Sequence, residues 1–241
     1  MISRLDGKVI LVTGAASGIG LAAARLIRES GGIAIASDIA AGADIALDVT
    51  DPRAWDDAIS GIVAEHGRLD GLVSNAGNMG AGPVVDLDMN AVRNVARVHV
   101  EGAFLGIQKV VAQLRKQGSP ASGSIVATSS IMGSVPYAGI ATYGLAKAAL
   151  SNMVKAIGVE LGRKGDFIRV NAVAPGPVRT PLLEGAVAPG YFDDASNFND
   201  VPLGQFAEPR DIAETIVFLL SDEASFMTAT VNIVDGGWGL S

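Results

Sequence analysis

The chain has 241 residues, of which 49% are hydrophobic, and this is enough to bury one large core. Its 18 Lys and Arg residues are scattered against 25 Asp and Glu residues, for a formal charge of −7, so no basic stripe could follow a nucleic acid. With no Cys and two His, the chain lacks the residues for disulfides or for a clustered metal site. We therefore expect a single domain over residues 1–241, with no metal and no nucleic-acid partner.

The start of the chain, MISRLDGKVILVTG, contains Arg4, Asp6 and Lys8 where a signal peptide would have an apolar segment. An uncharged run over residues 118–146 is long enough to span a bilayer, but its Ser, Gly and Pro residues divide it into strand and loop. These features predict a cytoplasmic protein that does not enter a membrane.

Short β-branched runs alternate with helical patterns along the whole chain. We expect strands over residues 8–13, 33–37, 44–49, 69–74, 124–129, 168–174 and 230–235. Between them, apolar residues at helical spacing predict the helices Ile19–Ser30, Pro52–His66, Asp88–Gln117, Thr142–Gly162 and Pro209–Leu220. This alternation predicts an α/β fold, a single doubly wound (Rossmann) domain whose seven-stranded parallel sheet is flanked by helices.

One connection breaks the alternation, because only residues 38–43 join the second and third predicted strands. Parallel neighbours usually need a crossover of a dozen or more residues. The helix between these strands is therefore expected to be shortened or absent, and an extended loop to take its place. The alternative is that residues 44–49, DIALDV, do not form a strand.

A glycine-rich turn, TGAASGIG, follows the first predicted strand and opens the helix that begins at Ile19. Glycines let the backbone approach a pyrophosphate, and the free N–H groups of the helix start attract its charge. Asp38 ends the next strand, where a carboxylate can accept hydrogen bonds from both hydroxyls of an adenosine ribose. The sequence thus predicts a dinucleotide site, with a tight turn that binds no ligand as the alternative.

A second motif, SSIMGSVPYAGIATYGLAK, ends on Tyr143 and Lys147. A spacing of four residues puts these two side chains on the same helix face. A nearby ammonium group favours phenolate and is expected to lower the pKa of the phenol from its reference value of about 10. The alternative is a solvated Lys beside a packed Tyr.

These motifs are similar to those of the short-chain dehydrogenases/reductases of the core NAD(P)-dependent type, over essentially the whole chain. The matching segments follow the family's order: TGAASGIG, LDV at Leu47–Val49, SNAG at Ser74–Gly77, Ser130, Tyr143-Gly-Leu-Ala-Lys147, PGPVRTP from Pro175, and DGGW near the end. The resemblance implies a dehydrogenase that moves a hydride between NAD and a secondary alcohol or ketone. It also implies a homotetramer, with the helices Asp88–Gln117 and Thr142–Gly162 as interface elements.

The resemblance assigns roles to particular residues. Tyr143 is expected to exchange the proton, Ser130 to orient the substrate oxygen, and Lys147 to tune Tyr143 and hold the nicotinamide ribose. Ser129, the neighbouring serine, is expected to be structural. The cofactor-binding residues implied are Gly14, Ser17, Gly18, Ile19, Gly20, Asp38, Ile39, Asp48, Val49, Asn75, Ala76, Gly77, Tyr143, Lys147, Pro175, Gly176, Val178 and Thr180.

His99 stands where the family pattern N-x-x-G-x-F has its asparagine, in the segment His99-Val100-Glu101-Gly102-Ala103-Phe104. In relatives the asparagine helps to hold a water linked to the lysine, so the usual proton relay is in question here. Either His99 takes part in catalysis, or it is a packed core histidine. Participation predicts a step in the pH profile of oxidation near the ordinary histidine pKa of about 6.5.

Three further expectations concern cofactor, substrate and rival functions. Asp38, together with Ala16 where NADP-dependent relatives often carry Arg or Lys, favours NAD. The expected substrate lid, residues 181–208, has no Lys or Arg, and this favours a small, neutral and largely apolar substrate. The alternative is that the acidic side chains of the lid face solvent and do not shape the site. The rival functions are a 3-oxoacyl-carrier-protein reductase and a non-catalytic NAD-binding sensor or scaffold. The lid residues concerned are Leu182, Leu183, Glu184, Tyr191, Phe192, Asp193, Asp194, Phe198 and Asp200.

Overall fold

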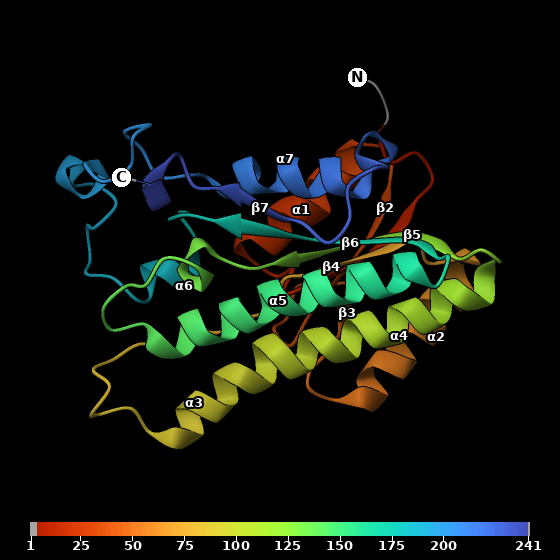
Figure 1. The fold of residues 1–241 in the computed structure, drawn as a ribbon, viewed down its shortest axis with the longest axis horizontal. Coiled ribbons are helices and arrows are strands. Elements are labelled where there is room, and N and C mark those ends of the chain that lie inside the picture. Colours follow the sequence, from red (N-terminus) through yellow and green to blue (C-terminus); the bar gives the residue numbers. More distant parts are fainter. Residues whose placement is uncertain (1–3, 241) are drawn as a thin grey trace.

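All seven strands are parallel and form one sheet in the order β3-β2-β1-β4-β5-β6-β7, in a computed structural model that describes residues 4–240. Residues 1–3 and 241, and the side chains of Ala195 and Phe198, lie outside this description. The sheet confirms the predicted doubly wound architecture (Figure 1). Its strands are β1 (Val9–Thr13), β2 (Ile33–Asp38), β3 (Ile45–Ala46), β4 (Gly71–Ser74), β5 (Ser122–Thr128), β6 (Phe167–Pro175) and β7 (Val231–Val234).

Helices cover both faces of the sheet, as Figure 1 shows. On one face lie α1 (Gly18–Glu29) and α7 (Pro209–Leu220), and on the other lie α2 (Pro52–His66), α4 (Gly102–Gln117) and α5 (Ala141–Arg163). Each face has its own aliphatic core, because both sides of a parallel sheet are buried. Shorter elements are α3 (Met89–Ala96), α6 (Pro181–Glu184) and the 3-10 helices Ile131–Gly133, Ala195–Phe198, Asp222–Ala224 and Trp238–Leu240.

The third strand is shorter than predicted, because β3 has two residues and the expected strand over 44–49 therefore stops early. The Asp48 carboxylate accepts hydrogen bonds from the backbone N–H and the hydroxyl of Thr50, both at 2.8 Å, and this turn ends the extended segment. As predicted, the loop before β3 contains no helix over residues 39–44. Instead, the Asp44 carboxylate accepts from the N–H of Ala36 at 2.8 Å and from Arg28 at 2.6 Å, which fastens the loop to the sheet.

The predicted helix Asp88–Gln117 is interrupted in its middle. Between α3 and α4 the backbone forms a π-helix over Arg97–Glu101, and His99 lies at the centre of this wider turn. Such turns are rare and occur frequently at functional sites. The following Gly102 lets α4 approach the sheet edge, since a Cβ there would stand 2.7 Å from Cγ2 of Val49.

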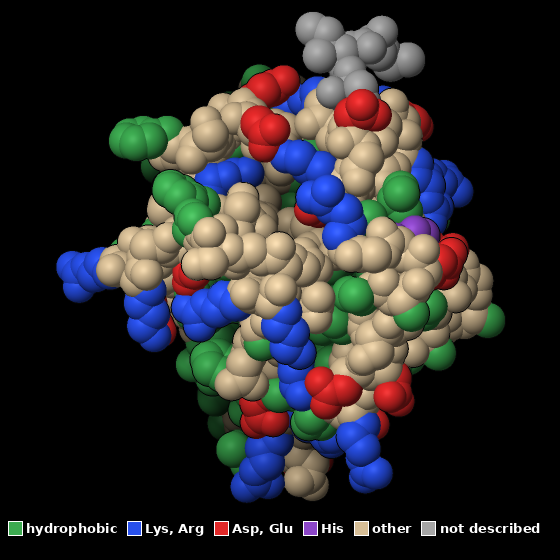
Figure 2. All heavy atoms as spheres, turned by 90° about the vertical axis from the view of Figure 1, so that its right-hand side faces the viewer, with side chains coloured by type: hydrophobic (Ala, Val, Ile, Leu, Met, Phe, Trp, Pro, Cys, Tyr) green, Lys and Arg blue, Asp and Glu red, His purple; other side chains and the backbone are tan. Residues whose placement is uncertain are grey.

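The face at the amino ends of the strands carries many Lys and Arg side chains with Asp and Glu side chains among them, as Figure 2 shows. Basic residues occupy the last turns of three helices, Arg28 in α1, Arg115 and Lys116 in α4, and Arg163 in α5, where they complement the negative ends of the helix dipoles. Within residues 4–240, the helices are too short or too polar to cross a bilayer.

Candidate active site

A cavity of about 940 Å³ opens at the carboxyl ends of the strands. It lies at the topological switch point of the sheet, where β1 has β2 on one side and β4 on the other. Ligands of doubly wound sheets bind in such crevices. Of the eighteen residues predicted to bind the cofactor, all except Gly20 line this cavity.

The glycine turn after β1 is shaped by close backbone contacts. A Cβ on Gly20 would stand 2.2 Å from the carbonyl oxygen of Gly14, so Gly20 lets α1 pack against the turn and contacts no ligand space. Gly14, whose φ is +66°, is equally confined, because its Cβ would stand 2.8 Å from Cα of Ala76. Gly20 is thus the one predicted cofactor residue outside the cavity lining, and it supports the turn.

Asp38 is held at the end of β2 by two backbone amides. Its carboxylate accepts from the N–H of Ala16 and from the N–H of Ala40, each at 3.0 Å. Because each carboxylate oxygen has a second lone pair, this geometry leaves acceptors for a pair of vicinal hydroxyls. The start of α1 and the fixed Asp38 carboxylate therefore fit the pyrophosphate and the ribose of a dinucleotide.

Ser130, Tyr143 and Lys147 come together in the same cavity. Ser130 forms a side-chain hydrogen bond with Tyr143, and the Nζ atom of Lys147 lies 5.4 Å from the centroid of the Tyr143 ring. Lys147 is 3% exposed, and its ammonium group donates to the carbonyl oxygen of Thr128 at 2.6 Å. The expected catalytic group is thus assembled by the end of β5 and one face of α5.

The electrostatics of this group differ from the prediction. Burial raises the pKa of Tyr143 to about 12. This effect is larger than the lowering of the pKa by the hydrogen bond with Ser130. Burial also lowers the pKa of Lys147 to about 7. The expectation that Lys147 lowers the pKa of Tyr143 below its usual value is wrong for this arrangement, because loss of hydration disfavours the charged form of both groups.

Ser129 points away from the reacting groups. Its hydroxyl donates to the backbone oxygen of Lys147 at 3.0 Å and lies 2.6 Å from the hydroxyl of Ser151. These contacts tie the end of β5 to α5. The geometry therefore agrees with a structural Ser129 beside a Ser130 that contacts Tyr143.

His99 is 2% exposed and stands edge-on to the Tyr143 ring. Its Nε2 atom lies 2.8 Å from the backbone oxygen and 3.1 Å from the backbone nitrogen of Asn78. Burial and the nearby charge of Lys147 lower the pKa of His99 to about 3. A pKa this low keeps the imidazole neutral near pH 7, which favours the packed core histidine over a step in the pH profile near 6.5.

Three buried polar atoms beside the catalytic group have no hydrogen-bond partner among the described residues: Nδ1 of His99, Oδ1 of Asn78 and Oγ1 of Thr128. All three residues line the cavity. Buried groups of this kind normally find a partner. Asn78 and Thr128 were missed by the sequence reasoning, although each directly adjoins a motif that it used, SNAG and SS.

The lid, the loop before α5 and the chain end supply a mainly apolar and aromatic part of the lining, which we call the substrate wall. Of the five acids in the lid, which include Glu208, only Asp200 lines the cavity. The expectation that Glu184, Asp193 and Asp194 shape the site is therefore corrected. Tyr137 and Trp238, with ring centroids 6.1 Å apart, were missed by the sequence reasoning. The substrate wall consists of Met132, Tyr137, Leu182, Leu183, Val187, Tyr191, Asn197, Asp200, Phe206 and Trp238.

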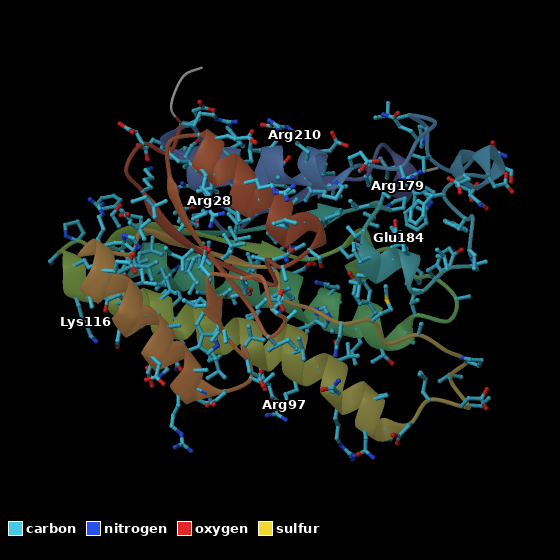
Figure 3. The ribbon with its side chains drawn as sticks, turned by 180° about the vertical axis from the view of Figure 1, so that it is seen from behind. Arg28, Arg97, Lys116, Arg179, Glu184 and Arg210 are labelled. Carbon is cyan, nitrogen blue, oxygen red and sulfur yellow. The ribbon has the colours of Figure 1, made fainter. Side chains whose placement is uncertain are left out.

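An aromatic cluster inside the lid is held by Arg179, which precedes the lid in the chain. The rings of Phe192 and Phe206 meet edge-to-face at 5.1 Å, and the guanidinium group of Arg179 lies 5.0 Å from the Phe192 ring centroid. Arg179 also donates to the backbone oxygen of Phe192 at 3.0 Å. Figure 3 shows Arg179 and Glu184 at the end of the molecule that carries the lid.

Comparison with known proteins agrees with this geometry. Residues 14–239 match the family model described as enoyl-(acyl carrier protein) reductase. A 2,5-dichloro-2,5-cyclohexadiene-1,4-diol dehydrogenase of Sphingobium indicum is 36% identical, over 100% of this chain and 99% of that protein. A cis-4-hydroxycyclohexanecarboxylate dehydrogenase of Sinomonas cyclohexanicum is 38% identical, over 96% of each. The crystal structure of levodione reductase superposes with a TM-score of 0.91 and 29% identity, over 99% of this chain and 100% of that one.

A doubly wound sheet that carries a Ser, a Tyr and a Lys at its carboxyl edge, beside a dinucleotide crevice, defines a nicotinamide-dependent oxidoreductase. The chain belongs to the short-chain dehydrogenase/reductase family, and it interconverts secondary alcohols and ketones with NAD(H) or NADP(H).

Proposed function

We propose that the protein is an NAD-dependent dehydrogenase of small, neutral, cyclic secondary alcohols. The observation that carries this proposal is the shared cavity, in which the Ser130, Tyr143 and Lys147 side chains lie at one part and the fixed Asp38 carboxylate at another. The two relatives described above act on six-membered rings by name, which supports a cyclic substrate.

In the proposed reaction, the phenol oxygen of Tyr143 exchanges the hydroxyl proton of the alcohol, and Ser130 orients the reacting oxygen by a hydrogen bond. A bound nicotinamide supplies the hydride acceptor. Lys147 is proposed to hold the nicotinamide ribose beside Tyr143, since its Nζ atom lies 5.4 Å from the centroid of the Tyr143 ring. General acid–base catalysis of this kind contributes roughly 10²–10⁴-fold to the rate.

The preference for NAD over NADP rests on Asp38. A 2′-phosphate would meet this carboxylate, whereas ribose hydroxyls would donate charge-assisted hydrogen bonds to it. One cation, Arg97 of the π-helix (Figure 3), also lines the cavity, but its charge acts on Asp48, whose pKa is held low first by the hydrogen bonds from Thr50 and then by this arginine. We therefore assign Arg97 to the adenine side and not to a phosphate site.

His99 is proposed to position Tyr143. A neutral imidazole packed edge-on against the phenol ring restricts that ring, and the Nδ1 atom provides a buried polar group next to the charge of Lys147. In this role the histidine holds the Tyr143 ring in place, and its imidazole stays neutral between pH 5 and 9.

The substrate is proposed to be neutral because, among the described residues, the cavity lining contains two cations, Arg97 and Lys147, and neither belongs to the substrate wall. An alkyl or ring substituent fits the side chains of Met132, Leu182 and Leu183 there.

The assembly is proposed to be a cytoplasmic homotetramer in which each chain acts as one domain with a lid over residues 181–208. Large apolar side chains on α4 and α5, namely Phe104, Leu145 and Val159, are exposed and support an interface along these helices. Light scattering is expected to give four chains per particle, and Phe104→Arg to give a smaller one. A monomer for the unmodified protein contradicts this arrangement.

The experiment that tests the proposed activity is a panel of cyclic alcohols and ketones with NAD(H) and NADP(H), followed by nicotinamide absorbance. Turnover of a cycloalkanol with NAD supports the proposal. Binding of NAD without turnover of any alcohol or ketone supports the rival sensor function. A 3-oxoacyl-carrier-protein reductase is disfavoured because, among the described residues, the substrate wall contains no Lys or Arg with which an acidic carrier could pair.

A further inference from the structure

The substrate wall contains a polar group of three side chains within its aromatic surface. Tyr137, Tyr191 and Asp200 line the cavity together. Burial is the main cause that raises the pKa of Tyr191, and Tyr137 and Asp200 raise it further, so each of these two groups lies within electrostatic reach of Tyr191. A substrate bound against the substrate wall therefore lies near two phenols and a carboxylate.

The charge of this group is negative, and it differs from the charge near the catalytic residues. Lys147 belongs to the catalytic group, and Arg97 lies beside Asp48 on the cofactor side. Within the described part of the lining, the substrate wall itself contributes one charged side chain, Asp200. Asp200 is also exposed, so it lies where the cavity opens to solvent.

The aromatic side chains of the substrate wall suit a ring-shaped substrate. Tyr137 and Trp238 lie 6.1 Å apart, and Tyr191 stacks on Phe206 at 5.6 Å with 18° between the ring planes. These flat groups are fixed by one another. We expect an apolar ring bound against these side chains to hold its substituents next to the polar group.

We propose that the substrate is a cyclic diol, and that Asp200 accepts a hydrogen bond from the hydroxyl that does not react. This inference rests on the proposed function and names its substrate class. An ionised carboxylate accepts hydrogen bonds and cannot donate them, so it favours a hydroxyl and repels a carboxylate substituent. At the reacting carbon the C–H bond gives a hydride to NAD⁺, the O–H proton passes to Tyr143, and the product is a hydroxyketone with its second hydroxyl intact.

The inference separates the two relatives by the chemistry of their substrates. One is named for a ring with two hydroxyls and the other for a ring with a carboxylate. The structure favours a diol for this chain, because the one charged side chain of its substrate wall is the carboxylate of Asp200 and a carboxylate substrate would need a cation there.

The test compares three substrates, cyclohexanol, 1,4-cyclohexanediol and 4-hydroxycyclohexanecarboxylate, by their kcat/KM with saturating NAD. The unmodified protein is expected to prefer the diol over the carboxylate by about tenfold or more. In Asp200→Asn the ratio of carboxylate to cyclohexanol is expected to rise about tenfold, and the ratio of diol to cyclohexanol to fall. Asp200→Glu is expected to keep the original order because it keeps the charge.

The matched control is Asp193→Asn, which removes the same charge from an exposed lid position outside the cavity lining and is expected to leave all ratios unchanged. Ratios in Asp200→Asn that stay within twofold of the unmodified protein overturn the inference, while turnover of cyclohexanol still supports the proposed function. A preference of the unmodified protein for the carboxylate also overturns it, without need of any variant. Failure to oxidise all three alcohols contradicts the proposed function itself, and the inference with it.

Discussion

The imidazole of His99 meets the phenol ring of Tyr143 edge-to-face, with ring centroids 5.5 Å apart and 89° between the ring planes. This contact joins the π-helix between α3 and α4 to the first turn of α5. The position of the reacting phenol therefore depends on a buried residue of a different helix.

Replacing His99 with Asn is expected to change stability at acid pH and to leave the shape of the kcat–pH curve unchanged between pH 5 and 9. The pKa of His99 is about 3 in the folded chain, against about 6.5 when unfolded, so the unfolded chain binds the extra proton between these values. Stability of the unmodified protein therefore falls as the pH falls from 6.5 to 3, by up to about 1.4 kcal/mol per pH unit, and His99→Asn removes this dependence.

Urea denaturation of the two proteins at pH 7 and pH 4 measures this difference. The matched control is His66→Asn, which changes the only other histidine in the chain. A kcat–pH step near 6.5 that disappears in His99→Asn contradicts a neutral imidazole and restores the titrating role.

Tyr143→Phe is expected to lower kcat by about 10²–10⁴-fold and to leave NAD binding intact, because only the proton-transferring hydroxyl is removed. Calorimetric titration with NAD checks the binding, and the near-ultraviolet circular dichroism checks the fold. Tyr137→Phe removes a phenol hydroxyl from the substrate wall and serves as the control. This variant is expected to change KM and to leave kcat unchanged. Activity of Tyr143→Phe above one tenth of the original contradicts the assigned role.

Alcohol oxidation is expected to rise with pH between 7 and 10, whereas ketone reduction does not. Burial raises the pKa of Tyr143 to about 12, so the phenolate that accepts the alcohol proton becomes more populated as the pH increases through this range. Reduction needs the phenol, which is the predominant form throughout. Initial rates in both directions at saturating cofactor measure this, and an oxidation rate that falls steadily from pH 7 to 10 refutes it.

Asp38→Ala is expected to narrow the preference for NAD over NADP, which we expect to be at least tenfold in the unmodified protein. Hydrogen bonds from the ribose to a carboxylate contribute about 1.5–3 kcal/mol, and the variant loses them together with the repulsion of a 2′-phosphate. The ratio of kcat/KM for the two cofactors measures the change. Arg97→Ala tests the other charged residue that lines this part of the cavity. If Arg97→Ala changes kcat/KM with NADP more than Asp38→Ala does, the 2′-phosphate binds beside the π-helix and not beside Asp38.

Gly77→Ala is expected to destabilise the protein by about 1–3 kcal/mol, because its Cβ would stand 2.4 Å from Cε1 of His99. The cost is expected to be smaller in a His99→Asn background, where the imidazole is gone. Denaturation of the four proteins of this double-mutant cycle gives the coupling free energy. Additive costs within about 0.5 kcal/mol contradict a direct clash between the two residues.

Much of the fold and cofactor site was predictable because it depends on local signals. The alternation of strands and helices, the glycine turn and the spacing of Tyr143 and Lys147 act over short stretches of chain. Gly20 illustrates the limit, since its place in the glycine motif did not reveal that the carbonyl of Gly14 fills the space beside it.

Other features were unpredictable from the sequence because they depend on packing between distant segments. The pKa values of Tyr143, Lys147 and His99 follow from how deeply tertiary structure buries them. Trp238 enters the substrate wall only because the chain end folds back toward the lid, where Gly237 has a φ of +88°. Which of the lid acids faces the cavity is likewise decided by the conformation of the lid.

The π-helix amounts to one residue more than a regular helix would hold between α3 and α4. Each residue of an α-helix advances the chain by about 100° around the axis. An extra residue in a regular helix would therefore turn α3 by that angle relative to α4, but the wider π turn holds the residue within one turn. Asn94 and Arg97 consequently line the cavity together with His99. The π turn thus accommodates one inserted residue and preserves the rotational phase between two collinear helices.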